Sequence, residues 1–403
     1  MLGKWMISLG ILVIFVLLFS GCTIEEADFE LHEWGVFVKG YECDDTMVRT
    51  ISPHTILVKK PLLYFHGVTD PLWVEIRIDS IRNATTVPSA VIKDGQILWK
   101  VMVEDDKIVS LNGTKYDRLF YEGEITTQVN VSAWIMVSAR NATFHVENLE
   151  DYSLSDIILI YGYPTGEPGY VYRGITYAYA DSLEGGRDLY LVVPLRNTTN
   201  WNLSDFRAGL MDRGLYPEEV DELLHLWERW WFYPTNLGNY SRLVFIIPQS
   251  VYDKLLPIHI KPEPKEMRRV GIFTITDIPI LSLELSTDKA TYEPGENVTI
   301  SLRISNHGNQ DASLTFRSAK LADLEILDEK GERVYLWSHG KYFAQVITHR
   351  TIEAGKSVEI LNITWNQIDN RGLPIKPGVY RVRGWLALPK RVYSNEVIIS
   401  ISG

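Results

Sequence analysis

The sequence predicts a mainly β protein: a β-rich N-terminal domain with an inserted αα-hairpin, followed by an immunoglobulin-like antiparallel β-sandwich. Apolar and polar residues alternate in stretches such as residues 72–79 and 131–137, which is typical of half-buried strands. Turn-forming pairs such as Asp94-Gly95 separate these stretches, as hairpins require. One region, residues 204–232, has helical periodicity instead.

The N-terminus has the features of an export signal. An apolar run, residues 5–19, is short for a bilayer span and about right for the core of a signal peptide. Ser20-Gly21-Cys22 follows, the order in which lipoprotein signal peptidases cleave before a cysteine that is then acylated. We therefore expect a signal peptide over residues 1–21 and lipidation of Cys22, the alternative being an uncleaved signal anchor. Either arrangement holds the protein at the outer face of the cytoplasmic membrane, on the cell surface.

Cysteine use and charge restrict the class of protein. The chain has two cysteines, so acylation of Cys22 leaves Cys43 as the remaining thiol and excludes a disulfide framework. With 403 residues, 46% of them hydrophobic, and 12 tryptophans, the chain can bury two sizeable cores. The formal charge of -11 and the lack of a basic patch argue against a nucleic-acid partner.

Asparagine-linked glycosylation motifs are in excess. The 17 Asn and 50 Ser and Thr residues predict about two Asn-x-Ser/Thr triplets by chance (17 × 50/403), whereas nine are present, none with a central Pro. This excess indicates a glycosylated cell surface, which for a prokaryotic lipoprotein points to an archaeon. The candidate glycosylation sites are Asn83, Asn112, Asn130, Asn141, Asn197, Asn202, Asn239, Asn297 and Asn362.

The N-terminal domain, residues 23–278, contains three distinctive motifs. They are Leu-His-Glu-Trp-Gly-Val-Phe at 31–37, Lys-Pro-Leu-Leu-Tyr-Phe at 60–65 and Leu-Phe-Tyr-Glu-Gly at 119–123. Through them, most of residues 30–276 resembles uncharacterised exported bacterial proteins that open with a His-Glu-Trp-Gly sequence. The resemblance implies no activity.

The helical region is predicted to form a hairpin. Ser204 can cap a helix that runs to Gly214, and Pro217, followed by two acidic residues, can open a second helix. Glu222 and His225 have the Glu-x-x-His spacing of di-iron bundles, but such sites need several inward-facing helices, so we expect a solvated face. The opposite face of the second helix is apolar and consists of Val220, Leu223, Leu224, Trp227 and Trp231.

Few residues indicate chemistry. The chain lacks a His-Glu-x-x-His motif, a paired-cysteine motif, a glycine-rich phosphate loop and a Gly-x-Ser-x-Gly elbow, so we expect neither catalytic residues nor a cofactor. Lone histidines in strands are usually structural, yet folding could gather several of them into a metal site. The weak candidates for metal ligands are His32, Glu33, His54, His66, His145 and Glu147.

Two stretches of the chain resemble each other. Residues 144–148 form an apparent strand that ends in Asn and is followed by a polar turn and a second strand at 157–160. Residues 302–306, followed by 314–316, repeat this pattern. The repetition indicates either a second immunoglobulin-like sandwich around residues 125–200 or two ordinary hairpins.

The C-terminal region, residues 279–403, has the regular turn spacing of a sandwich, with about seven strands. Its ordered motifs include Leu-Thr-Phe-Arg-Ser at 314–318, Val-Tyr-Leu-Trp-Ser at 334–338 and Pro-Gly-Val-Tyr at 377–380. Over about residues 290–400 they resemble the intracellular proteinase inhibitor (BsuPI-type) domain. The resemblance implies an inhibitor-like or adhesive sandwich and identifies no reactive-site residue. We expect Trp337 and the nearby Phe343 to pack inward.

Two functions remain open. The first is a non-enzymatic surface binding protein, attached to the membrane through its N-terminal lipid or anchor, whose partner is an extracellular protein or protease, or an envelope glycan. The second is an extracytoplasmic metal-dependent enzyme with a site in the N-terminal domain that includes His32 and Glu33. The lack of catalytic motifs favours the first.

Overall fold

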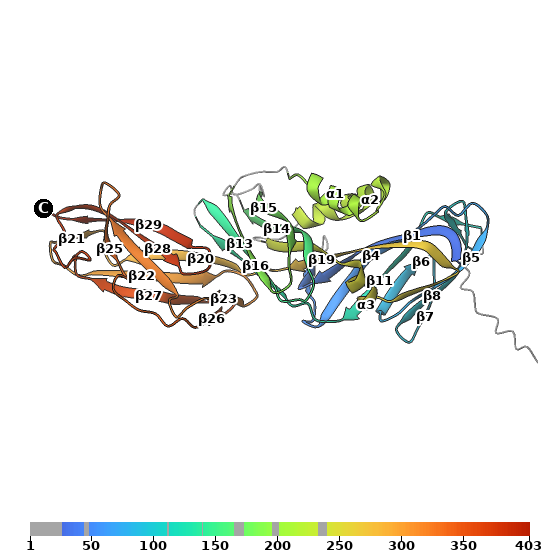
Figure 1. Cartoon of the computed structure of the whole chain (residues 1–403), viewed down its shortest axis with the longest axis horizontal. Coiled ribbons are helices and arrows are strands. Elements are labelled where there is room, and N and C mark those ends of the chain that lie inside the picture. Colours follow the sequence, from blue (N-terminus) through green and yellow to red (C-terminus); the bar gives the residue numbers. More distant parts are fainter. Residues whose placement is uncertain are drawn as a thin grey trace, which may run out of the picture.

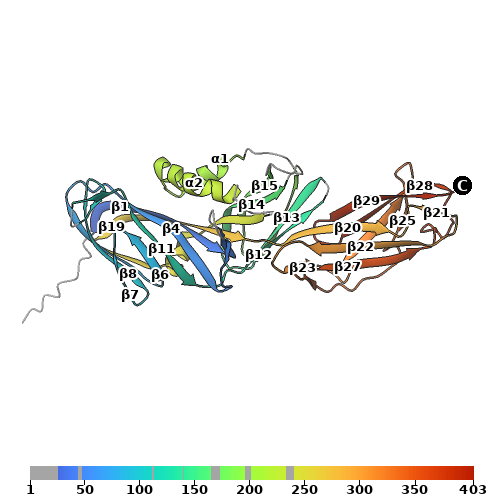
Figure 2. The ribbon, with the colours of Figure 1, turned by 180° about the vertical axis from the view of Figure 1, so that it is seen from behind.

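The computed structural model describes residues 26–43, 48–110, 113–138, 140–164, 173–195, 201–232 and 240–403. The predicted mainly β class is confirmed, with three helices in this part of the chain. Figure 1 shows an elongated molecule, with the C-terminal strands at one end and β5 (Leu72–Ile78) and β8 (Gln96–Glu104) at the other. The helices α1 (Ser204–Asp212) and α2 (Pro217–Phe232) lie between them, along one side. The view from behind agrees (Figure 2).

The largest sheet has eight strands and forms the centre of the N-terminal half. β1 (Glu26–Lys39) lies in its middle, parallel to β19 (Glu263–Thr276) and antiparallel to β4 (Thr55–His66). The strand order is β15-β14-β17-β19-β1-β4-β11-β6. The remaining strands are β6 (Arg82–Val87), β11 (Leu119–Thr126), β14 (Leu154–Pro164), β15 (Arg173–Leu183) and β17 (Tyr240–Ile247).

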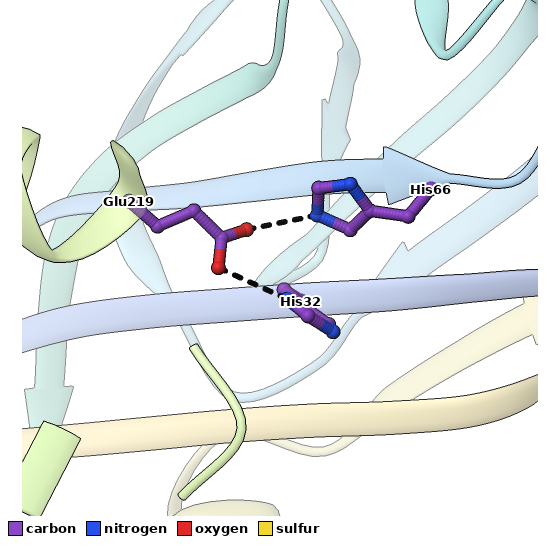
Figure 3. A group of neighbouring side chains, drawn as sticks. All are labelled: His32, His66 and Glu219. Carbon is purple, nitrogen blue, oxygen red and sulfur yellow. Dashed lines mark hydrogen bonds and ion pairs between the residues drawn. The ribbon is translucent and has the colours of Figure 1, made fainter. Parts of the chain in front are cut away.

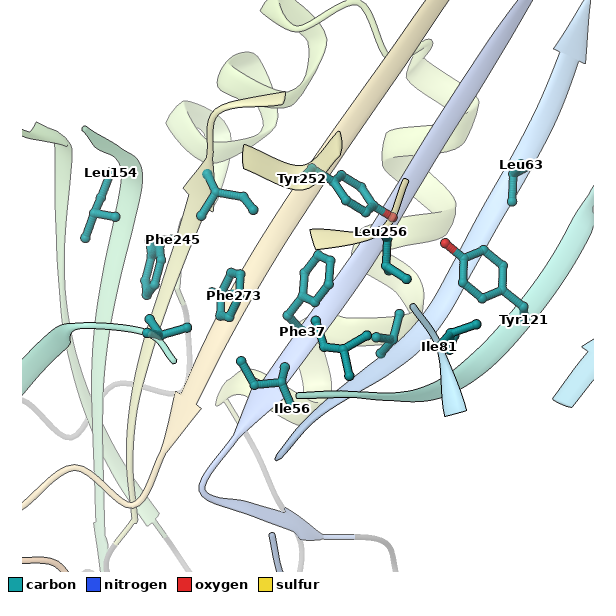
Figure 4. Close-up of a cluster of buried hydrophobic side chains, with 14 of the residues drawn as sticks. Phe37, Ile56, Leu63, Ile81, Tyr121, Leu154, Phe245, Tyr252, Leu256 and Phe273 are labelled. Atoms are coloured by element: carbon teal, nitrogen blue, oxygen red, sulfur yellow. The ribbon is translucent and has the colours of Figure 1, made fainter. Parts of the chain in front are cut away.

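Both faces of the eight-stranded sheet are covered, which is why β1 is buried almost throughout. Successive side chains of a strand point to opposite faces. On one face Phe37 stacks on Phe273 and meets Tyr252 in the core that Figure 4 shows. This core is shared with a sheet of order β10-β9-β8-β5-β18, in which β7 also pairs with β8. Its further strands are β7 (Val91–Lys93), β9 (Lys107–Val109), β10 (Lys115–Tyr116) and β18 (Ile258–Lys261). A separate antiparallel sheet of two strands consists of β2 (Tyr41–Cys43) and β3 (Val48–Thr50).

The helical hairpin covers the opposite face, over Trp34 and Val36. The apolar side predicted for α2 is buried as expected, with Trp231 fully enclosed. The predicted cap is wrong. Leu203 occupies the capping position of α1 without a side-chain hydrogen bond, and the Asn202 side chain instead accepts the N–H of Ser204 at 2.9 Å. The third helix, α3 (Gln249–Leu255), follows β17.

A six-stranded sheet joins the two halves of the molecule. Its order is β16-β13-β12-β20-β22-β27, and the central contact is a parallel pairing of β12 with β20 at Ile135 and Ile280. The boundary near residue 278 stays a prediction, but this sheet extends across it. The strands are β12 (Val131–Val137), β13 (Asn141–Asn148), β16 (Arg187–Pro194), β20 (Ile280–Thr287), β22 (Val298–Asn306) and β27 (Ser357–Trp365).

Residues 125–200 do not form a self-contained second sandwich. β12, β13 and β16 belong to the six-stranded sheet, whereas β14 and β15 belong to the eight-stranded sheet, although the two layers share a core. The repeated pattern nevertheless has a structural basis. Asn148 donates to the carbonyls of Tyr152 and Leu183, and Asn306 donates to those of Gln310 and Ile352. Each buried Asn thus fixes the turn that follows its strand.

The C-terminal sandwich packs β20, β22 and β27 against a second sheet of order β21-β29-β28-β24-β25. The predicted alternation in β22 is confirmed, because Val298, Ile300, Leu302 and Ile304 are all buried. Trp337 and Phe343 are half-buried and in contact, with ring centroids 5.7 Å apart. The other strands are β21 (Thr291–Tyr292), β23 (Ala312–Phe316), β24 (Ala322–Leu327), β25 (Arg333–Leu336), β26 (Thr348–Ile352), β28 (Gly378–Leu386) and β29 (Val392–Ile401).

Candidate metal centre

Two histidines and one glutamate meet where the helical hairpin covers the eight-stranded sheet. The register of β1 and β4 pairs His32 with Tyr64 and Glu30 with His66, so His32 and His66 lie diagonally on the same face. Their rings are 4.5 Å apart, centroid to centroid. Glu219 reaches them from the first turn of α2, as Figure 3 shows. In the part of the chain that the structure describes, His32, His66 and Glu219 are the one cluster of three or more side chains that could ligate a metal ion.

Glu219 is held at this position by the start of its own helix. Because Pro217 is the first helical residue, Glu219 is the third, and its carboxylate accepts the backbone N–H of Tyr216 at 2.7 Å. One carboxylate oxygen also accepts Nδ1–H of His32 at 3.0 Å, and the other accepts Nε2–H of His66 at 2.9 Å. The Glu219 carboxylate therefore joins α2 to both strands.

The Glu219 carboxylate is charged although it is buried. Its side chain is 3% exposed, as against 1% for His32 and 23% for His66. Burial acts to raise the pKa of Glu219, but the hydrogen bonds from the two histidines and from the Tyr216 amide outweigh it and lower the pKa to about 2. At neutral pH the site therefore presents a negative charge to two imidazoles.

The site adjoins a cavity of about 210 Å³ that His66 and Tyr216 help to line. The Tyr216 ring meets both imidazoles edge-on, at centroid distances of 4.7 Å from His32 and 4.6 Å from His66. Nε2 of His32, its second ring nitrogen, lies 3.7 Å from a carboxylate oxygen of Glu30. The cavity is also lined by Asp28, Phe29, Glu30, Gly67 and Lys265.

Glu33 does not join His32 in a site, because adjacent residues of β1 point to opposite faces. Its carboxylate accepts hydrogen bonds from Tyr121 at 2.5 Å, Tyr252 at 3.0 Å and Nε–H of Arg269 at 2.5 Å. The side chains of Glu33 and Arg269 are both fully buried. Burial and the Glu33 charge raise the pKa of both tyrosines well above their usual range. The network is therefore a structural ion pair, in which both carboxylate oxygens of Glu33 already accept hydrogen bonds.

The other candidates lie elsewhere. His145 is enclosed by the rings of Trp134 and Tyr190, at centroid distances of 4.8 and 4.5 Å, and burial lowers its pKa to about 4. Glu147 lies on the same strand and accepts a hydrogen bond from Ser132 at 3.3 Å. His54 is exposed in the turn before β4. None of these side chains meets His32.

The helix residues with di-iron spacing are also separated. Glu222 accepts hydrogen bonds from Tyr64 and Arg118, whereas His225 is exposed, as predicted for a solvated face. Sequence reasoning missed Glu219, which it treated only as an acidic residue in the first helical turn. The available signal was the pair of histidines, His32 and His66, in two strands of the N-terminal domain, but their partner Glu219 lies 187 positions from His32.

Six of the nine predicted glycosylation sites lie among the described residues, and all six asparagines are exposed: Asn83, Asn130, Asn141, Asn202, Asn297 and Asn362. Asn112, Asn197 and Asn239 lie outside the described residues, as does Cys22 with the whole predicted signal peptide. Among the residues that the structure describes, no helix has the length and apolar character needed to cross a membrane.

Comparison with known proteins identifies the C-terminal region. A family model described as intracellular proteinase inhibitor, BsuPI, matches residues 285–391, so the expected resemblance is confirmed. No curated protein matches the chain.

Solved structures match over about 30% of the chain. They include a DNA glycosylase from Pseudomonas fluorescens (13% identity, 30% of each chain, TM-score 0.21) and the sporulation control protein Spo0M from Bacillus subtilis (16% identity, 30% of this chain and 49% of that one, TM-score 0.20). A CARDB domain from Pyrococcus furiosus also matches (11% identity, 31% and 94%, TM-score 0.19). This chain covers less than a third of the first structures that it matches, and their functions are not transferred to it.

Proposed function

We propose that the protein is a non-enzymatic binding protein of the cell surface, held there by its N-terminus, and that its BsuPI sandwich recognises an extracellular protease. The observation that carries the proposal is an exposed loop of the sandwich, residues 339–347, which connects β25 to β26. All of its side chains except Phe343 are exposed, and its apolar members are Tyr342 (100%), Val346 (54%) and Ile347 (69%).

The exposed loop is anchored just before its start and near its middle. Before it, the hydroxyl of Ser338 donates to the buried carboxylate of Asp323 at 2.6 Å. Within it, Ala344 accepts the backbone N–H of Ala319 at 2.9 Å, and Phe343 packs on Trp337. An apolar segment that is exposed yet fixed in place loses little conformational entropy on binding, which favours recognition of a protein cleft.

The location at the cell surface is supported by three features. The apolar run that ends at Cys22 has the pattern of a lipoprotein signal, and Asn-x-Ser/Thr triplets are in excess. Every described asparagine of those triplets is exposed, as attachment of a glycan requires. The start of β1 and the C-terminus lie at opposite ends of the molecule, so an N-terminal tether leaves the sandwich far from the membrane (Figure 1).

The proposal is tested by protease inhibition. The full chain is mixed with a panel of secreted serine proteases of subtilisin-like and chymotrypsin-like specificity, and cleavage of a small substrate is followed. We expect one class to be inhibited, and Tyr342→Ala to weaken inhibition by about 30-fold, the loss typical of a central interface residue. Ile398→Ala, which changes an exposed apolar residue on β29, is the matched control. Activity of every protease unchanged by the folded full chain contradicts the proposal.

A metal-dependent enzyme, the second function that the sequence leaves open, is favoured by one observation: the meeting of His32, His66 and Glu219. Metal binding is its first requirement.

A further inference from the structure

We propose that His32, His66 and Glu219 bind a divalent transition metal, Zn²⁺ by chemical preference, with one coordination position open to the adjoining cavity. This site is independent of the protease recognition proposed above, since it lies in the N-terminal half and involves none of the residues of the exposed loop.

The donor atoms select the class of metal. Two imidazole nitrogens and one carboxylate oxygen suit Zn²⁺ and its transition-metal neighbours, whereas Mg²⁺ and Ca²⁺ prefer oxygen ligands throughout. The same set of two histidines and a glutamate, with a fourth position free for water, is one of the ligand sets of zinc sites.

The distances between the donors lie on both sides of the spacing that a tetrahedral ion requires. The ligand atoms lie within 4.8 Å of one another, and the hydrogen-bonded N···O distances are 2.9 and 3.0 Å. Bonds of about 2.1 Å to a tetrahedral Zn²⁺ place ligand atoms about 3.4 Å apart. Replacing the two hydrogen bonds by metal bonds therefore requires Glu219 to withdraw by a few tenths of an ångström and the widest pair of ligand atoms, up to 4.8 Å apart, to close toward about 3.4 Å, movements that side-chain rotation can supply.

The surroundings provide an outer partner and an entry path. If Nδ1 of His32 binds the metal, Nε2–H of His32 points toward the Glu30 carboxylate, now 3.7 Å away, and a carboxylate behind a ligating histidine orients the ring and raises its basicity. His66 and Tyr216 line the cavity, so the fourth position faces space large enough for water or an oxygen ligand. Three protein ligands with an open position distinguish this arrangement from a closed structural site.

The competing explanation is that Glu219 only anchors α2 to the sheet. In that case its hydrogen bonds to the two histidines and to Tyr216 are the whole purpose of the cluster. The two explanations differ in what added metal does to the folded protein: a metal joins β1, β4 and α2 and so raises thermal stability, whereas a metal-free anchor gains nothing.

The experiment uses the full chain, purified in mild detergent and stripped of metal with a chelator. Zn²⁺ is titrated by calorimetry, and Co²⁺ by its visible absorption, which is strong for tetrahedral coordination. We expect one metal per chain, a tetrahedral Co²⁺ spectrum and a rise in Tm. Glu30→Gln should weaken binding by about 10- to 100-fold, as outer partners of metal ligands do, and His66→Gln by more than about 100-fold.

His225→Gln is the matched control, because His225 is an exposed histidine on the same helix as Glu219. The affinity of the His225→Gln variant for Zn²⁺ should equal that of the native chain. Metal binding that His66→Gln leaves intact, or the absence of binding to the folded native chain, overturns the proposal. If His66→Gln fails to fold without metal, the Co²⁺ spectrum of the native chain decides, since a weak octahedral spectrum contradicts the proposed four-coordinate site with one open position. Protease inhibition is measured on the same samples and tests the other proposal separately.

Discussion

Glu33→Gln is expected to destabilise the protein by about 3–5 kcal/mol, the usual cost of removing one charge from a buried ion pair. Neither Glu33 nor Arg269 is exposed to solvent. The substitution leaves the guanidinium with one carboxylate partner, Asp253 at 2.9 Å, whose side chain is 40% exposed. It also turns an acceptor that serves Arg269, Tyr121 and Tyr252 into a group with N–H donors of its own. At least one buried donor then loses its acceptor, which accounts for about 1–3 kcal/mol of the total.

The assay is urea unfolding of the full chain, followed by tryptophan fluorescence, with the midpoint and slope compared between variants. The matched control is Glu75→Gln, because Glu75 pairs with Lys100 at 2.7 Å on the surface of β5, where both side chains are more than half exposed. We expect the control to unfold close to the native midpoint. Equal midpoints for the two variants would refute the assignment of Glu33 to a buried structural ion pair.

Four further predictions follow from the sequence and fold. Burial lowers the pKa of His145 from 6.5 to about 4, so between these pH values His145 is protonated in the unfolded chain but neutral in the folded one. The free energy of unfolding should therefore fall by about 3 kcal/mol as pH decreases through this range, and His145→Phe should remove this pH dependence. Cys22→Ser should release or mislocalise the protein, whereas Cys43→Ser should leave its membrane association intact. Trp385→Ala should cost about 3–5 kcal/mol, because the ring is buried. Residues 279–403 alone should unfold cooperatively but self-associate, because the fragment exposes the edge of β20 that normally pairs with β12.

These four predictions have distinct contradicting results. A flat stability profile in the native chain would place His145 in contact with water, and membrane release by both cysteine variants would exclude lipidation as the cause. An unchanged midpoint for Trp385→Ala would mean that the ring is not part of the cooperative unit. A monomeric fragment of residues 279–403 would show that the edge of β20 freed from β12 needs no other partner strand.

Much of the fold could be predicted from local patterns. Alternation identified strands such as β22, and the apolar stripe of α2 was assigned to the correct side, because each pattern depends only on periodicity within one element. The pairing of β12 with β20 could not be predicted. Parallel strands far apart in sequence are brought together by the packing of whole layers, and no residue near Ile135 or Ile280 signals that contact.

The candidate metal centre also has a part that local sequence patterns predict and a part that depends on tertiary packing. Period-two alternation alone separates His32 from Glu33, so their placement in one metal site was wrong on grounds already present in the sequence. The meeting of His32 and His66 depends on the register of β1 with β4, which a bulge between Trp34 and Val36 shifts. Glu219 enters only because the helical hairpin covers this face of the sheet, a consequence of tertiary packing.

The six-stranded sheet has a mechanical consequence. A load applied between the start of β1 and the sandwich passes along the chain at residues 277–279, between β19 and β20, and is shared there by the pairing of β12 with β20, where Ile135, Met136 and Val137 align with Ile280, Leu281 and Ser282. Side chains on the two faces of β12 belong to different cores, since Ile135 packs toward the N-terminal half and Trp134 toward the sandwich. Tension is thus shared by backbone hydrogen bonds and by two layers of packing. The two halves should therefore resist bending more than domains joined by a linker alone.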